Sequence, residues 1–175
     1  MKRIPLFFLL ALFTTACSTQ QVSTPASANL WQVNDTIAVK VTGQVQDNEL
    51  LARLTREIKS QLILAGFDIE KQSDKKLLLN VHVRQYTPGN NALRLTVGFG
   101  AGRGSLIYTA EYIGTDGKVL AKMDGQERFT GQEVGFNTNY GVATTLGGEE
   151  TVRTVLLKEA GRHIVELAVK PEAAR

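Results

Sequence analysis

The chain has 175 residues, of which 43% are hydrophobic, and its 20 basic and 17 acidic residues give a formal net charge of +3. This length is enough for one ordinary domain with a proper core. The basic residues form no cluster of the kind that nucleic-acid-binding domains carry, so no nucleic acid is expected as a partner. Two histidines and one cysteine leave little for a transition-metal site.

The first seventeen residues have the layout of a bacterial export signal. Lys2 and Arg3 precede an apolar run from Ile4 to Phe13, and small residues then lead to Cys17. The run is shorter than the roughly 20 apolar residues that cross a bilayer, so residues 1–16 are expected to be a signal peptide. Removing these residues takes away two basic side chains, and the mature chain keeps only one more basic than acidic residue.

Cys17 is the only cysteine of the chain, and we expect it to be lipidated. A thiol directly after the cut accepts a diacylglycerol and the new amino group accepts an acyl chain, and several acyl chains hold a protein on a bilayer far better than one. An unpaired thiol in an oxidising compartment is otherwise hard to explain. Thr14 stands where leucine is usual, whereas Thr15 and Ala16 fit a lipoprotein signal.

The alternative is an ordinary secreted protein that is cut after Ala16 or near Ala26-Ser27-Ala28, which would be soluble in the periplasm. Ser18 follows Cys17 in place of the aspartate that favours retention in the inner membrane. The expected location of the lipidated form is therefore the periplasmic face of the outer membrane.

Residues 17–34 are predicted to be the lipidated cysteine and a flexible tether that lets the domain stand off the bilayer. The stretch from Ser18 to Leu30 is uncharged and rich in Ser, Thr, Gln and Ala, a composition that cannot bury enough apolar area to order itself. Residues 35–170 are predicted to form a single domain, and residues 171–175 a frayed tail.

The domain is predicted to begin with a strand over Thr36–Thr42, whose alternation places every second residue on one face. Asp47 is expected to cap a helix from about Asn48 to Ala65, and Gly66 to end it. The apolar face of this helix recurs every four residues and consists of Leu50, Leu54, Ile58 and Leu62.

Five further strands are predicted before the last helix: Phe67–Lys71, Lys76–Tyr86, Leu93–Val97, Ser105–Gly114 and Lys118–Phe129. The second of these has a mostly polar outer face from Leu78 to Tyr86. Asp116-Gly117 supplies the positive φ angles of a tight hairpin between the last two strands.

Glu149 and Glu150 open a last helix after a glycine-rich loop over residues 131–148. Pro171 ends this helix, whose expected buried row is Val152, Leu156, Ala160, Ile164 and Leu167. The order strand, helix, strands, helix predicts an α+β fold, in which two helices pack on one face of a mostly antiparallel sheet.

The glycine-rich run from Val97 to Leu106 is the candidate for binding chemistry. Its G-x-G-x-G spacing and the strand that follows do not match a dinucleotide fingerprint, and it lacks the ending of a P-loop. We expect these glycines to serve a bend, with a positive φ in at least one of them. Gly100, Gly102 and Arg103 are kept as possible contacts for a ligand or partner. An envelope hydrolase or transferase with its site near Gly98–Gly104 is the alternative function.

No catalytic residue, metal site or cofactor is predicted. His82 lies on the polar face of a strand and His163 beside the buried row of the last helix, positions where a single histidine more often packs than reacts. No serine has the G-x-S-x-G context of a nucleophile elbow.

Three stretches resemble the bacterial lipoproteins grouped as domain of unknown function 4410: LARLTREIKSQLILAGFDI (Leu51–Ile69), VGFGAGRGSLIYTAEYIGTDGKVL (Val97–Leu120) and the closing helix. The resemblance covers most of residues 35–170. It implies a small envelope lipoprotein with no assigned reaction and no catalytic residues to carry over. The expected function is that of a lipid-anchored, non-enzymatic binding module. Its expected partners are membrane lipid, through Cys17, and an envelope protein.

Overall fold

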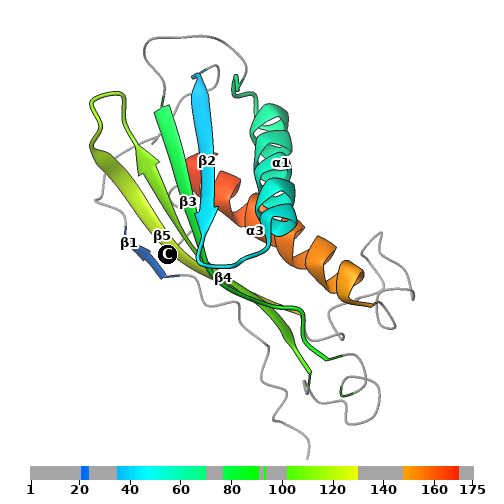
Figure 1. Cartoon of the computed structure of the whole chain (residues 1–175). Coiled ribbons are helices and arrows are strands. Elements are labelled where there is room, and N and C mark those ends of the chain that lie inside the picture. Colours follow the sequence, from blue (N-terminus) through cyan, green and yellow to red (C-terminus); the bar gives the residue numbers. More distant parts are fainter. Residues whose placement is uncertain are drawn as a thin grey trace, which may run out of the picture.

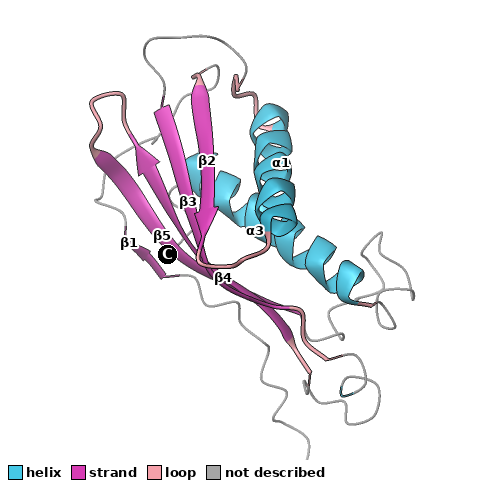
Figure 2. Cartoon of the chain, viewed as in Figure 1, coloured by secondary structure: helices cyan, strands magenta, loops and turns pink. Residues whose placement is uncertain are grey.

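The computed structural model describes residues 21–23, 35–69, 77–90, 93, 102–129 and 148–169. Within these ranges, five strands form one sheet in the order β1-β5-β4-β3-β2, and two long helices pack on one of its faces (Figure 1 and Figure 2). The predicted α+β class, with two helices on one face of a mostly antiparallel sheet, is confirmed. The sheet is mixed, because one of its pairs is parallel.

The parallel pair joins β2 (Ile37–Gly43) to β3 (Leu77–Thr87), and α1 (Asn48–Leu64) lies between them in the chain. A helix that crosses over a sheet returns the chain in its original direction, so the two strands run parallel. The Asp47 carboxylate accepts a hydrogen bond from the Leu50 N–H at 2.9 Å, which confirms the predicted cap.

The antiparallel part of the sheet is built from β3, β4 (Gly104–Ile113) and β5 (Val119–Phe129). The turn between β4 and β5 contains Gly117 with φ of 80°. The Asp116 carboxylate accepts a hydrogen bond from the Lys118 N–H at 3.0 Å in the same turn. The predicted Asp-Gly hairpin is therefore confirmed.

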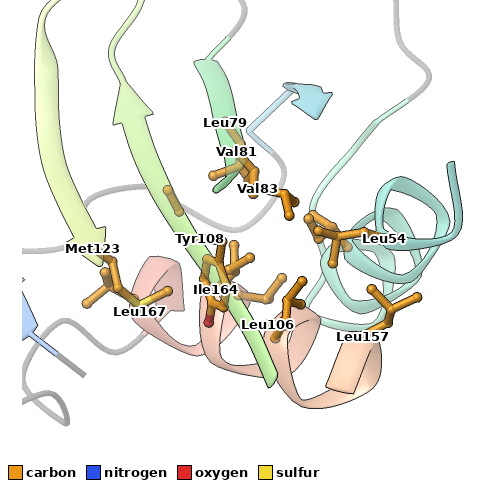
Figure 3. Close-up of a cluster of buried hydrophobic side chains, with 14 of the residues drawn as sticks. Leu54, Leu79, Val81, Val83, Leu106, Tyr108, Met123, Leu157, Ile164 and Leu167 are labelled. Carbon is orange, nitrogen blue, oxygen red and sulfur yellow. The ribbon is translucent and has the colours of Figure 1, made fainter. Parts of the chain in front are cut away.

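The core lies between the sheet and the helices α1 and α3 (Glu149–Val169), as Figure 3 shows. Both predicted helix faces are confirmed, since every residue of the two rows is at most 3% exposed. The helices approach closely at Gly161, where a Cβ atom would lie 2.8 Å from the Glu57 Cγ. A Cβ atom at this position would require the Glu57 side chain to shift, whereas the Glu57 backbone lies 3.6 Å away.

Two of the predicted strands are not found in the described residues. Instead of a strand from Phe67 to Lys71, the described residues 67–69 form one isolated bridge, between Asp68 and Thr36. Phe67 is buried, so its side chain packs in the core although its backbone joins no ladder. Leu93 is helical, and residues 94–97 of the other predicted strand lie outside the described residues. The predicted loop up to residue 147 and the tail at 171–175 lie outside them as well.

The short strand β1 (Gln21–Ser23) lies within the segment 17–34 that is predicted to be a tether. It pairs antiparallel with the centre of β5, Gln21 opposite Asp124 and Ser23 opposite Lys122. Without β1, the edge of β5 would present unpaired N–H and C=O groups. A nearby extended segment can pair with them even if its residues have little intrinsic preference for a strand. The remaining residues of the segment 17–34 lie outside the described residues.

Candidate functional site

The glycine-rich loop that the sequence singled out is described only at its end. Gly102 has φ of 68°, and a Cβ atom there would lie 2.2 Å from the Asn90 carbonyl oxygen. The Asn90 N–H donates to the Gly102 carbonyl at 3.0 Å, so this glycine closes the loop against the end of β3. The expectation of a positive φ is confirmed at Gly102. Arg103 is exposed, and Gly100 and Cys17 lie outside the described residues.

A buried polar network connects β4, β5 and α3 at a place that sequence reasoning missed. Glu127 is only 3% exposed. One of its carboxylate oxygens accepts from the Tyr108 hydroxyl at 2.9 Å and contacts His163 Nδ1 at 2.9 Å. The strand pattern could have revealed it, because Glu127 occupies an inward position in line with Met123 and Phe129.

The hydrogen bonds assign the tautomer of His163. Arg162 Nη2 lies 2.6 Å from His163 Nε2, and a guanidinium can only donate. His163 Nε2 therefore accepts, the ring proton sits on Nδ1, and that proton is donated to Glu127. Burial, followed by the nearby Glu127 charge, raises the pKa of Tyr108 well above its ordinary value. The Tyr108 hydroxyl therefore stays protonated and donates at neutral pH.

The network satisfies a buried carboxylate instead of presenting a reactive group to solvent. Tyr108 is buried and packs against β5 at Gly125, where a Cβ atom would lie 2.3 Å from the tyrosine ring. A substrate could reach Glu127 only after Tyr108 or α3 moved away. A carboxylate that accepts two hydrogen bonds no longer carries the cost of an unpaired buried charge.

A second charged cluster joins the amino-terminal ends of both helices to β3. Arg153 of α3 lies 3.2 Å from both Asp47 and Glu149, and its guanidinium sits 5.7 Å from the centroid of the Tyr86 ring. Arg53 of α1 pairs with Glu49 at 2.7 Å. These contacts tie α1, α3 and β3 together.

Tyr86 corrects the expectation of a polar outer face that runs to the end of β3. The register of β3 against β4 shifts between Val83 and Gln85. The extra residue, Arg84, turns the following side chains to the other face. Tyr86 therefore lies opposite the buried Leu106 and on the side of the helices.

The carboxyl-terminal ends of the two helices border a shallow hollow of about 260 Å³. It is lined by Gln61, Leu64, Ala65, Arg162, Val165, Glu166 and Val169. Leu64 and Val169, which both line this hollow, are 78% and 40% exposed. We call this hollow and the exposed side chains around it the apolar helix end.

The family model for the domain of unknown function 4410 matches residues 23–130, more than half of the chain. The chain belongs to this family. The resemblance seen in the sequence is thereby confirmed. Among curated protein sequences, none matches the chain.

The PelC structures share the fold of this chain. A variant of the PelC dodecamer from Paraburkholderia phytofirmans matches with 12% identity and a TM-score of 0.54, covering 85% of this chain and 97% of that one. The PelC dodecamer from the same organism matches with 16% identity and a TM-score of 0.51, covering 83% and 97%. The lipoprotein GNA1162 from Neisseria meningitidis matches with 12% identity and a TM-score of 0.43, covering 75% and 99%.

Neither α1 nor α3, the two long helices that the structure describes, is long and apolar enough to cross a membrane. Over the same described ranges, no three side chains of His, Cys, Asp or Glu gather as they would around a metal ion.

Proposed function

We propose that this member of the family is anchored by acyl chains on Cys17 at the periplasmic face of the outer membrane. Its domain acts by binding other macromolecules and not by catalysing a reaction. The export signal that ends beside a single cysteine supports the anchor. The inward orientation of Glu127 and His163 supports a structural role for the one buried carboxylate network described above.

The observation that carries the binding function is the apolar helix end. The exposed side chains of Leu64 and Val169 line a hollow, which is typical of a surface that another molecule covers. We propose that a second copy of the chain covers it. The PelC structures with the same fold are described as dodecamers, and this supports self-association as the mode of binding.

The test compares two lysine substitutions at exposed apolar positions. Leu64→Lys places a charge in the apolar helix end, and its position at the carboxyl terminus of α1 is compatible with the helix dipole. Val119→Lys, at a 52% exposed position in the hairpin end of β5, is the matched control. Mass measurement by light scattering should show an oligomer for the wild type and for Val119→Lys, and a smaller species for Leu64→Lys.

A wild-type chain that is monomeric at every concentration tested would refute self-association. An oligomer that Leu64→Lys leaves intact would place the interface on another surface.

A further inference from the structure

The pairing of β1 with β5 limits how far the domain can lie from its lipid anchor. Gln21 is the first residue of β1, and it lies opposite Asp124 in the middle of β5. Figure 1 shows β1 beside β5. Only four peptide units separate Gln21 from Cys17. A fully extended chain spans at most about 3.6 Å per residue, so Cys17 lies within about 14 Å of Gln21 whatever path residues 18–20 take.

This limit keeps the middle of β5 close to the bilayer surface. Paired strands are about 5 Å apart, which places Cys17 within about 19 Å of Asp124. The eleven residues of β5 span about 36 Å, so the anchor reaches only part of one edge of the domain. The acyl chains of Cys17 are buried in the bilayer, and Cys17 itself is therefore at the level of the headgroups.

Charge distinguishes the two faces that meet at this edge. We define the outer sheet face as the side chains of β2 to β5 that point away from the helices. Its charged members in the described strands are four basic and two acidic side chains: Lys40, Arg84, Lys122, Arg128, Glu111 and Asp124. The helices α1 and α3 together carry six basic and six acidic residues.

The two acidic side chains of the outer sheet face are already paired. Asp124 lies 3.0 Å from Arg84, and Glu111 lies 3.3 Å from Lys122. Neither acid pairs with Lys40 or Arg128, and both of these side chains are exposed. The outer sheet face therefore has a surplus of positive charge that complements anionic headgroups. The helices α1 and α3 have no such surplus, because their basic and acidic residues are equal in number.

We infer that the domain lies against the bilayer through the edge of β5 and the outer sheet face, with anionic lipid headgroups as the partner. The helices α1 and α3 and the apolar helix end then point away from the membrane. The inference rests on the proposed lipidation of Cys17. It places the domain closer to the bilayer than the predicted flexible tether over residues 17–34 does.

The test measures which face is near the headgroups in the acylated full chain. A spin label is placed at Gln126→Cys on the outer sheet face or, as the matched control, at Arg56→Cys on the exposed side of α1. The lipidated Cys17 has no free thiol and is not labelled. The protein is reconstituted in vesicles of phosphatidylethanolamine and phosphatidylglycerol that contain a nickel-chelating lipid. Relaxation of the label by the nickel headgroups should be severalfold stronger at position 126 than at position 56.

Two further variants test the two causes of this orientation, which are the short connection to Cys17 and the charge of the outer sheet face. A flexible insertion of twelve Gly and Ser residues between Ser18 and Thr19 adds about 20 Å of root-mean-square reach. It should bring the two positions to similar values without changing the domain. Lys40→Glu with Arg128→Glu should reduce relaxation at position 126, because it reverses the surplus charge.

Equal relaxation at both positions in the wild type, or stronger relaxation at position 56, would overturn the orientation. An unchanged signal in the double glutamate variant would overturn the role of anionic headgroups. Mass spectrometry separates this failure from that of the proposed function: a chain without acyl groups on Cys17 refutes both, whereas an acylated chain with the wrong face near the bilayer refutes only the orientation.

Discussion

At the scale of single residues, Glu127 is a carboxylate enclosed among apolar side chains. It is tolerated because Tyr108 and His163 each donate a hydrogen bond to it and Arg162 holds the histidine in the required tautomer. Removing one donor leaves part of this desolvated charge unsatisfied. The hydrogen bond of the neighbouring Thr109 is different, because its acceptor is partly exposed. The Thr109 hydroxyl donates at 2.6 Å to Asp124, whose side chain is 44% exposed. Water can replace this hydrogen bond if the hydroxyl is removed.

Replacing Tyr108 by phenylalanine should lower the free energy of unfolding by about 1–3 kcal/mol, the cost of an unsatisfied buried polar group. Thr109→Val is the control, and its effect should stay within about 0.5 kcal/mol. Chemical denaturation of the chain from Ser18 onward measures both. Equal losses for the two variants would contradict the structural importance of the network.

Alanine substitutions at Gly102 and Gly117 distinguish two costs of adding a Cβ atom, namely backbone strain and steric clash. Both have positive φ, and a left-handed conformation costs an alanine about 1–2 kcal/mol. A Cβ atom at Gly117 meets nothing within 4 Å, whereas at Gly102 it meets the Asn90 carbonyl oxygen. Gly102→Ala should therefore destabilise the domain more than Gly117→Ala, as thermal unfolding would show. If Gly102→Ala kept full stability, a binding role for this glycine would gain support.

At the scale of elements, helix faces were predictable whereas strand partners were not. The row from Leu50 to Leu62 reflects a period that the sequence alone displays. The direction of β2 relative to β3 depends on how the chain crosses over between them. The position of Tyr86 depends on a bulge at Arg84, and no alternation of residue types announces an extra residue in a strand.

Leu54→Ala should cost about 2–5 kcal/mol of unfolding free energy, the usual range for a truncated core leucine. Leu156→Ala, in the buried row of α3, should do the same. Arg56→Ala is the control on α1 because its side chain is exposed and lies outside the apolar helix end, and its effect should stay near 0.5 kcal/mol or below. Denaturant titration would contradict the assigned helix faces if Arg56→Ala were the most destabilising of the three.

At the scale of the whole molecule, the proposed lipid anchor on Cys17 restricts how the domain moves relative to the bilayer. The strand β1 lies too close to Cys17 in the chain for the domain to move freely above the bilayer. The apolar helix end would then be available to further copies in the plane of the membrane. An attachment of this kind sets the orientation in which partners meet the domain.

Cys17→Ser removes the thiol that we propose to accept the lipid. The variant should lose its acyl chains and appear either as soluble periplasmic protein or uncut at the inner membrane. Ser18→Asp is the matched variant, since it should keep the acyl chains and shift the protein to the inner membrane. Fatty-acid labelling and density separation of the membranes measure both outcomes. An unlabelled, soluble wild-type protein that begins at Asn29 would show an ordinary secretory signal.

The sequence by itself determined the features that depend on residues near one another in the chain. These are the apolar amino-terminal run that ends near a single cysteine, the two amphipathic helices, the Asp-Gly turn and the α+β class. Each is a local pattern, either of period or of turn chemistry, that can be read without knowing the fold.

Only the tertiary structure decided which distant segments meet. It brought Glu127 to His163 across 36 positions of the chain, paired Gln21 with Asp124, and placed Tyr86 beneath Arg153. The physical reason is that a buried carboxylate, an open strand edge and an aromatic ring can each be satisfied by many partners. The packing of the whole core selects one of them.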